Sequence, residues 1–170
     1  MKTWKVIPFA LGTLFLLIVA GIAAIGFLVP AERSYANTVE INAPIEKVWQ
    51  VITDKPRFPE WHPYMKKVEI KDDSHWIESS DDDTEPWKFS VVKDAKPDRL
   101  EIQFSVKDAL SGKWVGDASA TETGTRLKTV DSERIDNPLT RIITFLFIDR
   151  DKYAKGWNSS LKAQVEKLGR

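Results

Sequence analysis

The two histidines, His62 and His75, are the residues of this chain best suited to acid–base chemistry near neutral pH. A histidine that acts as a general base needs a partner to orient its ring, and the sequence shows none for either. His62 lies in a turn between Trp61 and Pro63, and His75 lies near a predicted strand start. We expect structural or solvent-exposed roles for both. The sequence does not indicate a zinc site, because the chain has no cysteine and no paired histidine spacing.

Acidic residues cluster at positions 81–85, which read Asp-Asp-Asp-Thr-Glu. Such a run could bind Ca²⁺, but it lacks the distal glutamate of a calcium loop, and Pro86 stands where the glycine would be. We interpret it as a solvated hairpin tip. Ser111 and Ser119 belong to no nucleophile motif. The sequence therefore predicts no metal, no cofactor and no catalytic residue.

Aromatic side chains are the strongest candidates for a binding site. They provide large apolar contact areas, and tryptophan and tyrosine each add one polar group. The candidate ligand-binding residues are Tyr64, Trp76, Trp87, Phe89, Phe104, Trp114, Tyr153 and Trp157. The alternative is an ordinary hydrophobic core, since a small domain must bury its aromatic residues. Trp61 is interpreted as a packing residue of its turn.

The first elements that position these residues are a strand and two short helices. Alternation predicts a strand over residues 35–41. Asn42 offers an N-cap, and Pro44 fits the first turn of a helix that continues to about Thr53. Residues 58–61 form a second short helical turn.

From position 64 the apolar period changes to two, which is typical of strands. Six further strands are predicted, over about residues 64–71, 75–79, 87–91, 100–106, 114–120 and 126–135. Short turns, such as Thr123-Gly124, join them. Consecutive strands with short connections form an antiparallel sheet.

The chain ends in a helical pattern with one apolar stripe. The stripe contains Leu139, Ile142, Ile143 and Leu146 and continues through Tyr153, Trp157, Leu161, Val165 and Leu168. Residues 149–151 mark a kink or a break. The stripe, Trp157 included, is expected to face the sheet. The fold class is therefore α+β, with about seven strands and a long C-terminal helix that enclose a core or a cavity.

The first 30 residues predict a membrane anchor. Residues 6–29 contain no charged side chain, and as a helix they would reach about 36 Å, more than the ~30 Å hydrocarbon core of a bilayer. Lys2 and Lys5 precede the run, so the N-terminus is expected in the cytoplasm and the rest outside it, as a single-pass protein of the plasma (inner) membrane. Trp4 is expected at the membrane interface.

Two alternatives to the anchor stay open. A signal peptide has a shorter apolar region, although residues 34–36 offer small side chains for cleavage. A buried soluble helix is rarely apolar on all sides. The predicted organisation is a cytoplasmic N-terminus (1–5), a transmembrane helix (6–29), a linker (30–36) and one domain (37–170).

Composition narrows the choice of partners. Lysine plus arginine and aspartate plus glutamate number 25 each, and two of the lysines precede the anchor. The remainder is slightly acidic, so a nucleic-acid partner is not expected. Without cysteine, an extracytoplasmic domain must be held together by packing alone. We expect this domain to be monomeric.

Three segments carry a resemblance to a known family. Residues 38–49 resemble the opening strand and helix of polyketide cyclase/dehydrase-type (SRPBCC) proteins of the START-like superfamily. Residues 59–64 resemble the aromatic-proline turn that follows, with His62 where asparagine is usual, and residues 151–162 resemble the closing helix. The resemblance covers about residues 36–168. It implies a helix-grip fold with an apolar cavity between the curved sheet and the long helix.

Three functions are compatible with these observations. The first, which we favour, is a membrane-tethered domain that binds an apolar small molecule or a lipid. The second is a cyclase/dehydrase-type enzyme that uses polar cavity residues such as Tyr64, His75 or Tyr153. The third is an envelope interaction module whose cavity is filled by side chains. The volume of the cavity and the presence of an acid–base pair inside it would separate them.

Overall fold

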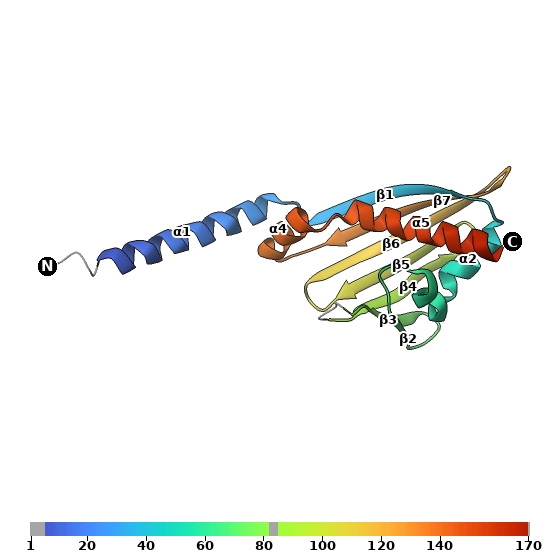
Figure 1. Ribbon diagram of the computed structural model, residues 1–170, viewed down its shortest axis with the longest axis horizontal. Coiled ribbons are helices and arrows are strands. Elements are labelled where there is room, and N and C mark those ends of the chain that lie inside the picture. The colour runs from blue at the N-terminus through green and yellow to red at the C-terminus, as the bar shows by residue number, and fades with distance from the viewer. Residues whose placement is uncertain (1–5, 82–84, 170) are drawn as a thin grey trace. The chain divides into compact units, whose positions relative to one another are not determined.

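The computed structural model describes residues 6–81 and 85–169, which form two units. The unit that holds the candidate anchor, called the anchor unit below, contains residues 6–31 together with Ile135–Ile148. The sheet domain contains Glu32–Arg134 and the residues from Asp149 onwards. Figure 1 labels their helices and strands.

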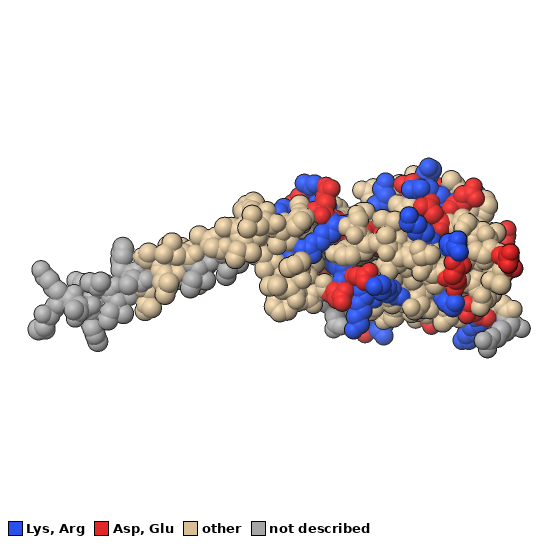
Figure 2. All heavy atoms as spheres, turned by 90° about the horizontal axis from the view of Figure 1, so that it is seen from above, with Lys and Arg blue, Asp and Glu red and all other residues tan. Residues whose placement is uncertain are grey.

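The anchor unit consists of two apolar helices, α1 (Val6–Leu28) and α4 (Pro138–Phe147). α1 is long and apolar enough to cross a membrane. Only uncharged residues are visible along its described part (Figure 2). Asn137 caps α4, since its side chain accepts hydrogen bonds from the backbone N–H groups of Leu139 and Thr140. Lys2, Trp4 and Lys5 lie outside the described residues.

The sheet domain is built on one antiparallel sheet of seven strands, in the order β1-β7-β6-β5-β4-β3-β2 (Figure 1). Its strands are β1 (Glu32–Ile41), β2 (Lys67–Ile70), β3 (His75–Ser79), β4 (Trp87–Ala95), β5 (Arg99–Val106), β6 (Leu110–Thr121) and β7 (Gly124–Arg134). Between β1 and β2 the chain forms α2 (Ile45–Thr53), the 3₁₀ turn η1 (Lys55–Arg57) and α3 (Phe58–Trp61). β1 and β2 therefore occupy opposite edges of the sheet.

The long helix α5 (Arg150–Leu168) runs across the sheet and contacts β1 and α2 (Figure 1). Its stripe supplies Leu161 and Val165 to the core, where they are fully buried together with Ile41 and Leu127. This core closes one part of the space between helix and sheet. Acidic and basic side chains are mixed on the visible face of the domain (Figure 2). The predicted α+β class, the seven-stranded antiparallel sheet and the long helix against it are confirmed.

Several predicted boundaries differ from those of the structure. β1 begins at Glu32, which pairs with Arg134, so most of the predicted linker 30–36 is strand. The first residues of this edge strand are mostly polar, as in a linker, so the sequence did not indicate that the strand begins there. The α2 helix begins at Ile45 with Pro44 in the cap position, so Asn42 is not its N-cap. β2 is shorter than predicted, and Tyr64 precedes it.

The predicted C-terminal helix is two helices, and the kink or break expected at residues 149–151 is a break. Ile148 has extended backbone angles, and the Asp149 side chain accepts a hydrogen bond from the Lys152 N–H, which starts α5 as a new helix. The stripe from Leu139 to Leu146 therefore belongs to α4 in the anchor unit, where Leu139, Ile143 and Leu146 are exposed. The sheet domain lacks Ile135–Ile148, which the predicted domain 37–170 included.

Candidate functional site

The sheet domain contains a cavity of about 110 Å³ between the sheet and α5. An apolar cavity of about 150 Å³ is large enough to hold benzene, so this one has room for a small apolar group. Most of its lining is aromatic or aliphatic, and one part is charged. Seven of the eight predicted site residues border it: Trp76, Trp87, Phe89, Phe104, Trp114, Tyr153 and Trp157.

Cross-strand pairing builds the aromatic wall on the sheet. Trp76 on β3 lies opposite Phe89 on β4, and Phe89 lies opposite Phe104 on β5. Residues directly opposite each other share a face of the sheet, so the three rings form one row. The Trp76 and Phe89 rings are stacked, with centroids 5.2 Å apart, and Trp87 packs beside Phe104 at 5.9 Å. Because side chains two residues apart on a strand lie on the same face, these aromatic residues form one continuous apolar surface.

The α5 helix supplies the facing wall through Tyr153, Ala154 and Trp157. Trp157 faces the sheet as predicted, with its ring centroid 5.5 Å from that of Trp114 on β6. It also packs against Trp61, at 5.8 Å. The closing contact between helix and sheet is therefore aromatic on both sides.

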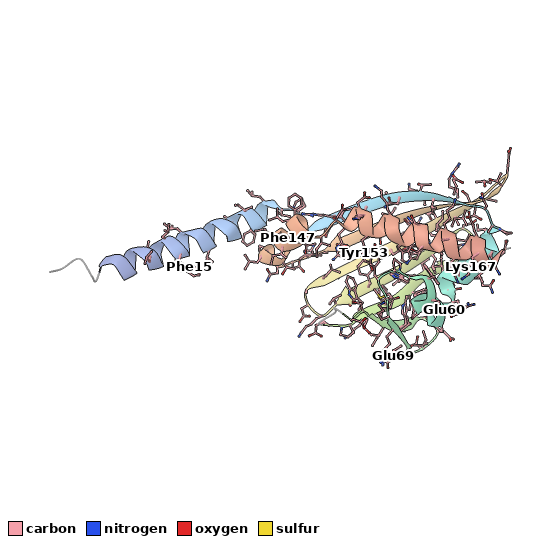
Figure 3. All side chains as sticks on the ribbon, in the orientation of Figure 1. Phe15, Glu60, Glu69, Phe147, Tyr153 and Lys167 are labelled. Carbon is pink, nitrogen blue, oxygen red and sulfur yellow. The ribbon has the colours of Figure 1, made fainter. Side chains whose placement is uncertain are left out.

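Tyr64 does not border the cavity but supports a residue that does. Its ring stacks on Tyr153 with a centroid distance of 4.0 Å. Its hydroxyl lies against the α5 backbone at Gly156, where a Cβ atom would be only 2.5 Å away. Tyr64 therefore fixes the position of Tyr153 from behind. Figure 3 labels Tyr153 on α5.

Glu78 places a carboxyl group in the cavity lining on β3. It is only 3% exposed, and the Trp76 Nε1–H donates a hydrogen bond to its Oε1 at 2.6 Å. Burial raises the pKa of Glu78 to about 7, against the opposing effect of that hydrogen bond. Near neutral pH this carboxyl group is thus able either to donate or to accept a proton.

A second group of charges lies where β7 and α5 meet. Asp131 and Glu133 follow the buried alternation of β7, and both line the cavity. Burial and the nearby charge of Glu133 raise the pKa of Asp131 to about 7, although Arg150 acts in the opposite direction. Burial also raises the pKa of Glu133. The two carboxyl groups lie too close together and too deep to be ionised as easily as exposed ones.

Arg150, the first residue of α5, faces these acids. Its Nε lies 3.4 Å from Glu133 Oε2 but makes no hydrogen bond among the described residues. Its guanidinium lies 5.8 Å from the ring centroid of Trp87, within range of a cation–π interaction. The Asp149 cap, one residue earlier, fixes where this helix and its arginine begin.

The Tyr153 hydroxyl completes the polar part of the cavity. Burial, and secondarily the charge of Glu78, raise the pKa of Tyr153 well above its usual value. The phenol is therefore neutral and can donate a hydrogen bond. An apolar molecule with one or two polar atoms would find aromatic walls, carboxyl groups, a guanidinium and a phenol in this cavity.

The two histidines differ in burial and therefore in role. His62 lines the cavity, where burial lowers its pKa to about 4 and keeps the ring neutral. Its Nδ1 accepts a hydrogen bond from the Tyr64 N–H at 3.3 Å, which is a structural role. His75 is solvent-exposed, as expected, and its side chain contacts Asp72 at 2.8 Å in the turn before β3. It does not line the cavity, where the enzyme alternative would have used it.

The described residues provide no evidence for a metal site. Within residues 6–81 and 85–169, no group of three histidine, aspartate or glutamate side chains is arranged to hold a metal ion. The acidic run considered for Ca²⁺ falls largely outside the described residues, because positions 82–84 are not among them.

Comparison with known proteins identifies the family. The model of the family described as "Polyketide cyclase / dehydrase and lipid transport" matches residues 32–168. The chain belongs to this family. No curated protein matches it. The start of the match coincides with the start of β1.

Solved structures with the same fold include members of the START superfamily. A START superfamily protein from Mycobacterium smegmatis is 16% identical, with a TM-score of 0.59, and the match covers 79% of this chain and 98% of that one. Norcoclaurine synthase from Thalictrum flavum is 13% identical (TM-score 0.63; 82% and 97%). The di-domain ARO/CYC protein BexL, from the BE-7585A biosynthetic pathway, is 15% identical (TM-score 0.65; 80% and 50%). At these identities the likeness shows the fold alone.

Sequence reasoning missed the charged residues of the cavity. A signal for them was present: Glu78 stands two residues after Trp76, and Asp131 continues the inward positions of β7. Arg150 stands three residues before Tyr153 and so shares its helical face. Their types do not indicate burial, because charged side chains on strands and helices usually face water.

Proposed function

We propose that this protein is a membrane-anchored domain that binds an apolar small molecule, or one end of a lipid, in the cavity between its sheet and α5. The observation that carries the proposal is the cavity itself, with aromatic walls and a cluster of buried polar groups. A few placed polar groups in an apolar pocket are typical of ligand sites. A module filled by side chains would not be expected to leave this space.

The polar groups narrow the class of ligand. Burying carboxyl groups beside a guanidinium is unfavourable unless other groups satisfy them, and the Arg150 Nε is left without a hydrogen bond among the described residues. A ligand with a hydroxyl, carbonyl or amino group at one end could satisfy it and its neighbours. The preferred ligand is therefore amphipathic, with its apolar part against Trp76 and Phe89.

In this proposal, α1 tethers the binding site to a bilayer. We propose a single-pass arrangement in the plasma (inner) membrane, with the N-terminus in the cytoplasm and the sheet domain outside it. The support is the charge-free helix α1 and the lysines that precede it. A tether of this kind is useful if the ligand, or the partner that receives it, is itself in the membrane.

Filling the cavity tests the proposal. Ala154 is buried on α5 and lines the cavity, so Ala154→Leu should occupy part of the space. Ala163, exposed on the same helix, gives the matched control Ala163→Leu. We expect an apolar fluorescent probe to bind the wild type and the control, with energy transfer from the cavity tryptophans, and to bind Ala154→Leu much more weakly. Absence of probe binding, and of any copurifying small molecule in mass spectrometry, would overturn the proposal.

A second candidate is an enzyme of the cyclase/dehydrase kind. The pair that favours it is Asp131 and Glu78, whose pKa values near 7 suit proton transfer, with the Tyr153 phenol in the same cavity. Once a ligand is identified by copurification, the two functions separate. Catalysis predicts that Asp131→Asn retains ligand binding but loses product formation, whereas a carrier forms no product in either protein.

A further inference from the structure

The α4 helix exposes its apolar side chains and buries a polar one. Thr144 is 7% exposed, whereas Leu146 and Phe147 are 62% and 78% exposed. The other exposed apolar side chains here are Leu139, Ile143, Phe145 and Ile148. A surface helix of a water-soluble protein shows the opposite pattern, with its apolar stripe on the core. Figure 3 labels Phe147 at the end of this helix.

Charge is confined to the beginning of α4. Arg141 is its only charged residue, and residues 142–148 are uncharged. The Arg141 guanidinium donates to the backbone carbonyls of Ile135 and Asp136, at 2.6 and 2.8 Å. The arginine is therefore held at the start of the helix, and the last two turns present only apolar groups and the buried Thr144.

The start of α4 is in direct contact with the end of α1. Gly26 is buried there, and a Cβ atom built on it would lie 2.5 Å from the Pro138 carbonyl oxygen. Such a distance is possible only because glycine lacks that atom. The Arg141 Nη1 also reaches the carbonyl of Val29, the residue that follows α1, at 3.5 Å. α4 thus begins where a chain that spans the bilayer leaves it.

We infer that α4 is a second membrane contact, whose exposed apolar face lies in the lipid interface beside the end of α1. The inference rests on the proposed role of α1 as the anchor. Ten residues reach only about 15 Å as a helix, too short to cross a bilayer but long enough to lie in its interface. Interfacial helices bury an apolar face about 5–10 Å into the boundary between headgroups and acyl chains. The occupant of this face is therefore lipid.

Depth-dependent quenching in the full-length protein tests the inference. The chain has no cysteine, so single cysteines can be introduced and labelled with an environment-sensitive fluorophore. Ile143→Cys and Leu146→Cys report on α4, and Leu17→Cys, near the middle of α1, reports on the anchor. Glu122→Cys, an exposed position at the hairpin between β6 and β7, is the control. It lies about 34 Å along β7 from Arg134, where the chain leaves the sheet domain for α4. Each protein is reconstituted into phosphatidylcholine vesicles brominated at shallow or deep acyl positions.

We expect loss of fluorescence with shallow bromines for the two α4 labels, with deep bromines for Leu17→Cys, and with neither for Glu122→Cys. Quenching at Leu17 without quenching on α4 would overturn the inference and leave the anchor intact. No quenching at Leu17 would overturn both. An apolar environment of the α4 labels without lipid quenching would assign this face to a protein partner, such as a second copy of the chain. Equal quenching at Glu122 would show that the α4 signal is not specific.

Discussion

Glu78 is a carboxyl group that the fold keeps almost fully out of water. Its hydrogen bond from Trp76 offsets only part of the penalty of burial, so the protonated form is favoured in the folded protein. Because the unfolded chain gives this group an ordinary pKa, folding takes up a proton between the two values. The stability that this group permits is therefore fully present below pH 4 to 5 and is lost as the pH rises through about 7.

Replacing this carboxyl group by an amide should remove its share of that pH dependence. We predict that Glu78→Gln gains stability relative to the wild type as the pH rises from 5 to 8, by about 3 kcal/mol at most. The side-chain oxygen of glutamine can still accept the Trp76 hydrogen bond. Chemical unfolding of the full-length protein in detergent, followed by tryptophan fluorescence at both pH values, measures the difference.

The comparison isolates Glu78, because Asp131, Glu133 and His62 are unchanged in the variant and their contributions cancel. Glu122→Gln, on the exposed hairpin between β6 and β7, controls for loss of one negative charge from the whole protein. An identical pH dependence in the wild type and Glu78→Gln would show that the buried carboxyl is ionised without penalty, and so would contradict the proposed polar cavity.

At the scale of elements, α5 supplies residues both to the cavity and to the core beside it. Its N-terminal turn carries Arg150 and Tyr153, and its next turns carry Trp157 and the core residue Leu161. The helix can approach its neighbours closely at Gly156, where the Tyr64 hydroxyl occupies the place of a side chain. This contact positions Tyr64, and through it Tyr153, against the cavity.

Substituting Gly156 by alanine tests this contact, because the effect on stability should change sign when the Tyr64 hydroxyl is removed. Alanine is favoured over glycine in a helix by about 1 kcal/mol, but its Cβ would meet the Tyr64 Oη at 2.5 Å. We predict that Gly156→Ala destabilises the protein when Tyr64 is present, because the tyrosine ring is held by its stack on Tyr153. In a Tyr64→Phe background the nearest ring carbon would lie 3.5 Å away, an ordinary contact, so the same substitution should stabilise.

The free energies of unfolding of the wild type, the two single variants and the double variant form a double-mutant cycle. We expect a coupling energy different from zero, because Gly156→Ala should lower the free energy of unfolding when residue 64 is tyrosine and raise it when residue 64 is phenylalanine. If alanine stabilises in both backgrounds, Tyr64 is free to move away, and the support of Tyr153 from behind is refuted.

At the scale of the molecule, the sequence predicted the sheet well, but it did not show that α4 and α5 belong to different units. Strand alternation is set by a geometry that every strand shares, so Trp76, Phe89 and Phe104 could be placed on one face. The stripe from Leu139 to Leu146 has the same helical period as that of α5. Periodicity reports that a helix has an apolar face, but not whether protein or lipid covers it. Residue types indicated a kink or a break at residues 149–151, but they could not decide between the two.

The candidate site was predicted in part for a related reason. Aromatic residues indicate a buried surface. Glu78, Asp131 and Arg150 are of types that usually face solvent, and only the packing of the strands and α5 buries them. Which buried surface leaves a void depends on how the facing side chains meet across the sheet and α5. Packing at that level follows from three-dimensional contacts and not from spacing along the chain.

The division into two units predicts how the protein responds to loss of its anchor. The fully buried residues Ile41, Leu127 and Leu161 all belong to the sheet domain, so a chain that starts at Ala31 should retain a cooperative unfolding transition. Its α4 helix, however, loses contact with Gly26 and still exposes Leu146. We predict that this truncated chain sediments with phosphatidylcholine vesicles and self-associates without them. This departs from the monomer expected from the sequence, because the exposed apolar side chains of α4 then have no lipid to cover them.

Making the α4 face polar supplies the control for that truncation. With Ile143, Leu146 and Phe147 all replaced by serine, the truncated chain should remain in the supernatant as a monomer and unfold at nearly the same temperature, because these side chains are exposed. Circular dichroism and sedimentation measure the two properties separately. A truncated chain with no unfolding transition in either form would show that α1 is needed to fold the sheet domain. Vesicle binding that survives the serine substitutions would place the membrane contact elsewhere on the protein.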